Sequence, residues 1–150
     1  MKQIIHRSAA IVATLCIATF ILSTVLVELF GSQAAIAQIK HIIVTPGLFI
    51  LIPCLAVTGA TGFLLAGTRT GGLIDKKKKR MPFIVLNGLL ILLPSAIYLD
   101  HLAESGDFNM QFYLVQVLEL LAGGVNLFLM SSNIRDGFKL SGRLRKRKAL

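Results

Sequence analysis

Four long apolar runs constrain this chain more than any other feature of its sequence. They cover residues 8–30, 42–67, 82–99 and 110–130. Each run has roughly the 20 residues that an α-helix needs to cross a hydrocarbon core about 30 Å thick. In lipid, every backbone polar group must find its partner within the protein, so the runs predict helices. The sequence therefore predicts an all-α fold, a four-transmembrane-helix bundle that forms a single integral membrane domain over residues 1–150.

The composition argues against a soluble catalytic unit. Hydrophobic residues make up 55% of the chain, and charged residues only 15%. Typical soluble domains carry about 25% charged residues. The segments outside the four runs are short, and the sequence contains no phosphate-binding loop, nucleophile elbow or metal-binding motif. An enzyme is therefore the less favoured class of protein.

The basic residues fall almost entirely on one side of the four runs. Fifteen of the sixteen Lys and Arg lie before the first run, between the second and third, or after the fourth, and only Lys40 lies elsewhere. Cytoplasmic segments of membrane proteins are enriched in Lys and Arg. Short connections make successive helices antiparallel. The sequence therefore predicts an up-down-up-down bundle in a bacterial inner membrane, with both termini in the cytoplasm.

The net charge of +9 favours contact with anionic lipid headgroups over binding to nucleic acid. No aromatic residues interleave with the basic tail to stack on bases. In this tail, residues 135–150, Gly137 is expected to end the fourth helix. The residues expected to contact headgroups are Lys76, Lys77, Lys78, Lys79, Arg80, Arg143, Arg145, Lys146, Arg147 and Lys148.

The first run also shares features with a secretory signal. Lys2 and Arg7 precede it, and the small residues of Ala35-Ile-Ala37 follow it. The apolar part of a signal has roughly 7–15 residues, whereas this run is longer and contains Glu28. We therefore expect a retained span, although cleavage after Ala37 would leave three spans in the same orientation.

Polar residues on the fourth run share one helical face. At 100° per residue, Gln116, Glu119, Gly123 and Asn126 fall within an arc of about 80°. This face is expected to point into the bundle or toward a partner. Asn126 lies at nearly the same depth as Asn87 on the third run, so the sequence predicts a hydrogen bond between these two side chains.

Glu119 lies about 13.5 Å below the outer end of its run, near the bilayer centre. An acid there costs roughly 2.5 kcal/mol or more, so it should be protonated or paired. Thr58 on the second run has a matching depth, and Gln116 is one turn away. A neutral Glu119 bonded to one of these is one interpretation. A proton relay, a ligand contact or a contact to a partner subunit are the others.

The second run carries a strip of small residues, Gly59, Gly62 and Ala66, within about 60° of arc. Such strips let neighbouring helices approach closely, so this run is expected to be central in the bundle. Proline removes a backbone hydrogen bond and allows a kink. The prolines inside the runs are Pro46, Pro53 and Pro94.

Two histidines fall at the same outer membrane surface. His41 opens the second run and His101 closes the third, with Glu28 slightly below. Hydrogen bonds to headgroups or nearby acids explain such residues most simply. Two imidazoles facing each other across helices are also suited to ligating haem iron, and imidazole with carboxylate to another metal. A quinone contact is a further alternative.

The pattern of His41, Arg80-Met-Pro, Asn87-Gly88 and Gln116-x-x-Glu119-Leu-x-Ala-Gly resembles small four-helix inner-membrane proteins of bacteria. This resemblance implies the bundle but no activity. The architecture is also similar to that of four-helix b-type cytochromes, in which paired histidines ligate haem b. That similarity implies His41 and His101 as the haem ligands.

Three functions follow as hypotheses. The first is an accessory or assembly subunit that contacts copies of itself, as a homo-oligomer, or a larger membrane complex. Its contacts would come from the polar face of the fourth run and the small-residue strip of the second. The second is an electron carrier with haem near the periplasmic face, and the third is a proton-coupled carrier that works through Glu119.

Overall fold

The computed structural model describes residues 2–67 and 71–140, and within these ranges the chain is helical with no strand. The helical segments in chain order are α1 (Lys2–Phe30), α2 (Gln33–Ile42), η1 (Ile43–Leu48), α3 (Phe49–Ala66), α4 (Gly72–Asn87), η2 (Gly88–Leu92), α5 (Leu93–Glu104) and α6 (Met110–Leu140).

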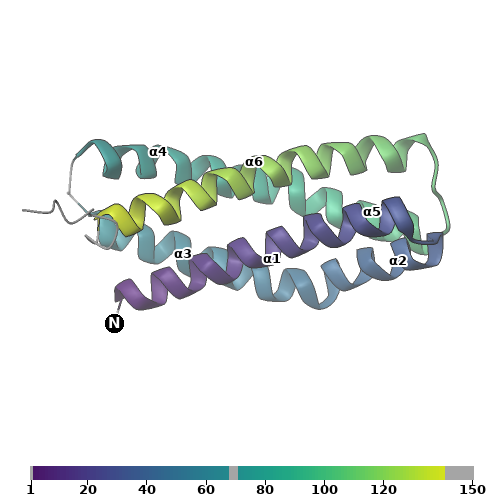
Figure 1. The fold of residues 1–150 in the computed structure, drawn as a ribbon, viewed down its shortest axis with the longest axis horizontal. Helices are drawn as coiled ribbons and strands as arrows, with labels where there is room; N and C mark the ends of the chain where they lie inside the picture. The colour runs from purple at the N-terminus through teal and green to yellow at the C-terminus, as the bar shows by residue number, and fades with distance from the viewer. Residues whose placement is uncertain (1, 68–70, 141–150) are drawn as a thin grey trace, which may run out of the picture.

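These segments form four continuous rods. Rod 1 is α1, rod 2 is α2-η1-α3, rod 3 is α4-η2-α5 and rod 4 is α6 (Figure 1). All four are long and apolar enough to cross a membrane. The chain is therefore a multi-pass membrane protein, and its all-helical fold agrees with the sequence-based prediction.

The rods are longer than the apolar runs that predicted them. Rod 2 begins at Gln33 and not at residue 42, and rod 3 covers 72–104 and not 82–99. Rod 4 continues through Gly137 to Leu140, so the expectation that Gly137 ends this helix is wrong. Hydropathy marks only the part of a helix that matches the hydrocarbon core, whereas backbone hydrogen bonding continues into polar sequence at either end.

Rods 2 and 3 are each interrupted by a wide π-helical turn. In η1 the backbone leaves helical geometry at Thr45, with φ −132° and ψ 107°, immediately before Pro46. In rod 3, η2 ends just before Pro94 in the first turn of α5. Proline lacks the N–H that would continue the helical ladder, which accounts for both positions. Pro53 lies inside the continuous helix α3.

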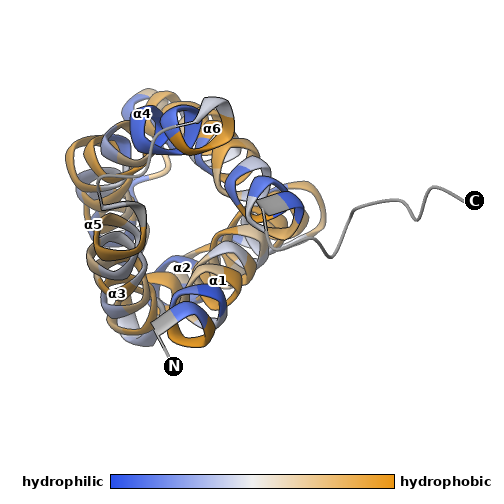
Figure 2. Ribbon diagram, turned by 90° about the vertical axis from the view of Figure 1, so that its left-hand side faces the viewer, coloured by the Kyte–Doolittle hydropathy of each residue, from blue (hydrophilic) through white to orange (hydrophobic). Residues whose placement is uncertain are grey.

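Each rod contacts two others around a common axis (Figure 2). Rod 1 packs against rods 2 and 4, and rod 3 packs against the same two rods. Gly47 permits close approach between rods 1 and 2, because a β-carbon there would lie 2.7 Å from Cζ of Phe20. One core cluster contains Ala13, Ile17, Leu51, Ile84 and Met130, and the other contains Ile36, Leu99, Leu102, Ala103 and Phe112.

The outward surface of the rods is apolar. Phe30, Phe49 and Phe128 are 83%, 73% and 71% exposed. A soluble protein rarely exposes so many large apolar side chains, whereas a membrane protein presents them to lipid. The segment expected as a cleavage site lies inside α2, where Ile36 is buried in the second core cluster. Residues on both sides of that segment therefore belong to the packed bundle.

Candidate functional site

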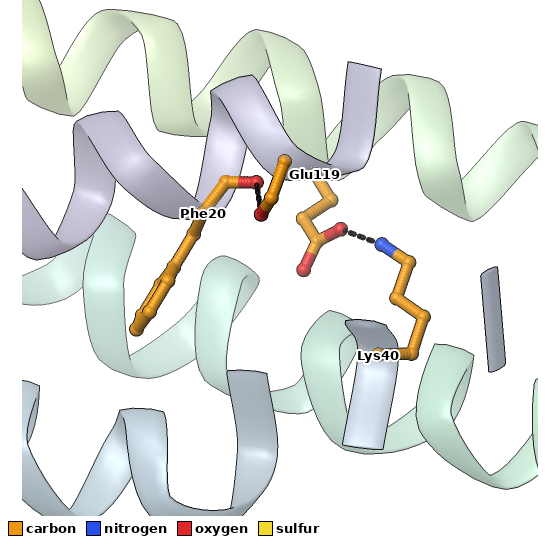
Figure 3. A network of polar contacts seen from close by, with 4 residues as sticks. Phe20, Lys40 and Glu119 are labelled. Atoms are coloured by element: carbon orange, nitrogen blue, oxygen red, sulfur yellow. Dashed lines mark hydrogen bonds and ion pairs between the residues drawn. The ribbon is translucent and has the colours of Figure 1, made fainter. Parts of the chain in front are cut away.

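A buried ion pair joins rods 2 and 4. Nζ of Lys40 lies 2.6 Å from Oε2 of Glu119, and the Lys40 side chain is only 1% exposed (Figure 3). Ser32 begins α2 by accepting a hydrogen bond from the backbone N–H of Ala35, so Lys40 lies two turns inside a helix. The expectation that Lys40 belongs to an outer loop is therefore wrong, because helical structure begins well before the second apolar run.

The partners expected for Glu119 are also wrong. The hydroxyl of Thr58 donates to the carbonyl oxygen of Cys54, four residues earlier on its own helix. Gln116 is 3% exposed, and neither atom of its amide has a hydrogen-bond partner among the described residues. Glu119 is paired with Lys40 because α2 brings the Lys40 ammonium group to the depth of Glu119. Lys40 lies outside the apolar runs, so counting depth along those runs could not predict this partner.

Two further polar groups lie near this ion pair. Glu28 of α1 is within electrostatic range of Lys40, and its buried Oε1 has no partner among the described residues. Gln116 lies one turn before Glu119 on α6. We name Lys40, Glu119, Glu28 and Gln116 the polar cluster. Uncompensated burial of polar atoms costs about 1–3 kcal/mol each, so this cluster is an expensive feature of the fold.

An apolar chamber of about 420 Å³ lies inside the bundle and ends at the polar cluster. Its lining comes from all four rods, and Glu119 is its one charged member among the described residues. Ile52, Phe63 and Leu89 line the chamber and are also 42%, 59% and 51% exposed on the outside of rods 2 and 3. The chamber therefore opens between these rods onto the surface that faces lipid.

A second cavity of about 320 Å³ continues from this chamber toward the end at which α1 begins and α6 ends (Figure 1). The two share Leu55, Gly59 and Val85 in their walls. Its basic lining residues are His6, Arg7, Lys77 and Lys78, and we name it the basic cavity. The interior of the bundle thus holds two adjacent cavities, one apolar and one basic.

The predicted hydrogen bond between Asn87 and Asn126 is confirmed. Nδ2 of Asn87 donates to Oδ1 of Asn126 at 2.9 Å, and Asn126 is fully buried. Asn87 also donates to the carbonyl oxygen of Ala122, and Asn126 to that of Ile84. Each Asn side chain therefore bonds both to the other Asn and to a backbone carbonyl oxygen of the opposite helix. These bonds tie rod 3 to rod 4.

The two faces expected to contact a partner lie inside this chain. Gln116 and Asn126 are buried, and Gly59 and Gly62 line the cavities. Gly62 faces rod 3, because a β-carbon there would clash with Cε of Met81. Gly62 and the polar face of α6 therefore serve contacts between the chain's own helices, whereas Gly59 borders open space in the cavities.

Both outer histidines are exposed. The ring of His41 is 64% exposed and has Nδ1 3.7 Å from Oδ2 of Asp100 on α5, while His101 lies at the surface of the same helix. Haem ligation by a pair of histidines needs two imidazoles directed at one iron, and the ring of His41 faces a carboxylate. Within the described residues, no group of three His, Cys, Asp or Glu could hold a metal ion. The arrangement gives haem binding no support.

One ion pair was missed by reasoning from sequence. Nη1 of Arg80 lies 2.8 Å from Oδ2 of Asp136, and the Asp136 carboxylate is 4% exposed. The available signal was that Asp136 is one of only two acids, with Asp75, on the basic side of the four runs. An acid placed among so many cations is expected to pair with one of them.

The four apolar rods and their buried polar interior define a multi-pass membrane protein with two adjacent internal cavities. Comparisons with protein-family models, with curated proteins and with solved structures found no match to this chain.

Proposed function

We propose that this protein binds a single lipid-like amphiphile, whose apolar part lies in the apolar chamber. The observation that carries this proposal is the chamber itself, about 420 Å³ in volume and open between rods 2 and 3. Small-molecule sites have volumes of about 300–1,000 Å³ and mostly apolar walls. Because the opening faces lipid, the molecules that can reach it are those dissolved in the membrane.

The polar cluster sets the end of this chamber. The ion pair of Lys40 with Glu119 links α2 to α6 across the interior of the bundle and places a charged wall beyond the apolar lining. A hydrocarbon chain gains nothing from contact with a charged wall, so its end stops there. The chamber therefore has a defined depth for the apolar part of the ligand.

Filling the chamber should prevent binding. Gly59 lines both cavities, and a β-carbon there would meet nothing within 4 Å, so Gly59→Phe places a ring in open space. We expect lipid that copurifies with the wild-type protein in mild detergent, quantified by mass spectrometry, to fall about tenfold, which corresponds to 1.4 kcal/mol of binding free energy.

Gly124→Phe is the matched control for this experiment. Gly124 is also helical and open, but it lies on the exposed side of α6 and lines neither cavity. We expect this variant to keep the wild-type amount of lipid. Equal lipid in both variants, or no stoichiometric lipid on the wild-type protein, would contradict the proposal.

The orientation in the membrane is part of the proposal. The spans run up-down-up-down with both termini in the cytoplasm of a bacterial cell, supported by the common end at which α1 begins and α6 ends (Figure 1). The basic residues Arg7, Lys77 and Arg80 on this end favour the cytoplasmic side. We expect green fluorescent protein fused after Leu150 to fluoresce and alkaline phosphatase fused there to be inactive. Active phosphatase at this position would reverse the topology.

The same preparation distinguishes the other functions. A colourless protein without bound lipid that copurifies with other membrane subunits would favour an accessory or assembly role. A Soret band that shifts on reduction and is lost in His41→Ala would favour haem binding. Ion-dependent flux in vesicles that is lost in Glu119→Gln would favour a proton-coupled carrier.

A further inference from the structure

The basic cavity combines basic side chains from two helices at one end of the bundle. His6 and Arg7 come from α1 and Lys77 from α4, and all three line the cavity. Lys77 reaches toward α6, because its Nζ lies 3.5 Å from where a β-carbon on Gly137 would stand. The basic side chains therefore converge on the space between three rods.

Two of these basic side chains, Arg7 and Lys77, carry like charges and repel each other. Arg7 and Lys77 lie within electrostatic range of each other, and both lie within range of His6. The described residues that line the cavity include no Asp or Glu. Asp136 is near enough to interact with Lys77, but its Oδ2 already accepts from Arg80 at 2.8 Å. An anion in the cavity would relieve this repulsion.

His6 is held with one nitrogen toward rod 2. The hydroxyl of Thr61 donates to the carbonyl oxygen of Val57, so its oxygen accepts from Nδ1 of His6 at 3.0 Å. The ring is also hydrogen-bonded to the backbone of Thr58, which fixes its orientation in the wall of the cavity. The imidazole thus adds an oriented polar group to the two fixed cations.

We propose that the basic cavity binds the headgroup of a phospholipid with a net negative charge, whose acyl chain continues into the apolar chamber. Leu55, Gly59 and Val85 line both cavities, so the headgroup and the acyl chain of one lipid would lie in adjacent spaces. A free phosphate would use only the basic cavity, whereas a phospholipid matches both cavities. This inference rests on the proposed function and names the headgroup that the bound amphiphile carries.

The test compares two lipids that differ only in their headgroup. The full chain in mild detergent is titrated with phosphatidylglycerol or with phosphatidylcholine of the same acyl chains, and binding is measured by native mass spectrometry. Each cation near a membrane surface contributes about 1 kcal/mol of attraction to an anionic lipid, or roughly fivefold in affinity. We expect the wild-type protein to favour phosphatidylglycerol by at least this factor.

Lys77→Gln should reduce the preference about fivefold, through weaker binding of phosphatidylglycerol, and should affect phosphatidylcholine less, because its choline cation offsets the charge of its phosphate. Lys76→Gln is the matched control, since Lys76 is exposed on the same helix and does not line the cavity. Arg7→Gln provides a second variant on α1 if Lys77→Gln folds poorly. The helical circular dichroism signal checks each variant.

Each other outcome contradicts a defined part of the proposal. Equal binding of both lipids, or an equal loss of preference in Lys76→Gln, overturns the headgroup site but leaves the lipid-binding function intact. Binding of neither lipid overturns the proposed function as well. Displacement of phosphatidylglycerol by inorganic phosphate, together with binding of phosphate alone, overturns the phospholipid as occupant of the cavity.

Discussion

Replacing Lys40 by Met is expected to lower the free energy of unfolding by about 3–5 kcal/mol, the usual cost of removing one partner of a buried ion pair. The Lys40 side chain is 1% exposed and that of Glu119 is 14% exposed, so neither lies open to solvent. Without Lys40, the carboxylates of Glu119 and Glu28 remain inside the bundle with no cation from α2. The measurement is unfolding by sodium dodecyl sulfate in mixed micelles, followed by circular dichroism.

Glu119→Leu should destabilise the bundle by a similar amount, because it leaves the Lys40 ammonium buried and unpaired. A neutral Glu119 would have predicted little effect from this change, so the variant separates the two interpretations. The double variant Lys40→Met with Glu119→Leu should lose much less than the sum of the single losses, since apolar pairs of similar volume often replace buried ion pairs without cost.

Two exposed positions serve as controls for this cycle. Lys76 is exposed on α4 and Glu104 is exposed at the end of α5. Lys76→Met and Glu104→Leu should change the free energy of unfolding by no more than about 0.5 kcal/mol. Additive losses in the double variant would show that Lys40 and Glu119 act independently, contrary to the ion pair.

Asp136→Leu is expected to cost about 2–3 kcal/mol, because it removes the carboxylate that pairs with Arg80. The side chain of Asp136 is 4% exposed and that of Arg80 is 27% exposed. The cost is smaller than at Lys40 because Arg80 can turn partly toward water or headgroups. Lys77 also loses its nearby acid, which increases repulsion among the cations of the basic cavity.

The same unfolding measurement tests this second ion pair. Arg80→Met should also destabilise the bundle, and the double variant Arg80→Met with Asp136→Leu should recover part of the loss. Lys79→Met, at an exposed neighbouring position of α4, is the control and should have little effect. An Asp136→Leu variant as stable as the wild-type protein would exclude a structural role for this pair.

The Asn87–Asn126 bond was predictable from sequence, whereas the Lys40–Glu119 pair was not. Both asparagines lie inside apolar runs, so their depth could be counted from the run ends, and residues at equal depth on adjacent helices meet. Lys40 lies before the second run, in polar sequence that gave no sign of belonging to the same rod. Counting depth fails where a helix extends beyond its apolar run.

The residues of the candidate site were likewise predictable from sequence only in part. Glu119, Gln116 and Glu28 could be selected from sequence because ionisable or amide groups within apolar runs are expensive in lipid. Their grouping with Lys40 required the packing of α2, and the role expected for Thr58 was not the one observed. His6 and Lys77 could not be placed in one cavity, since they belong to different rods.

The sequence by itself determined that the chain is an all-helical membrane protein with four spans and that its basic residues gather on one side. These features can be counted along the chain, because the membrane requires each span separately to be apolar and favours basic residues in the segments on the cytoplasmic side. Only the tertiary structure decided which polar groups pair and where the interior remains open. Those features depend on how four rods are ordered and bent around a common axis, and that order is fixed by side-chain contacts between residues far apart in sequence.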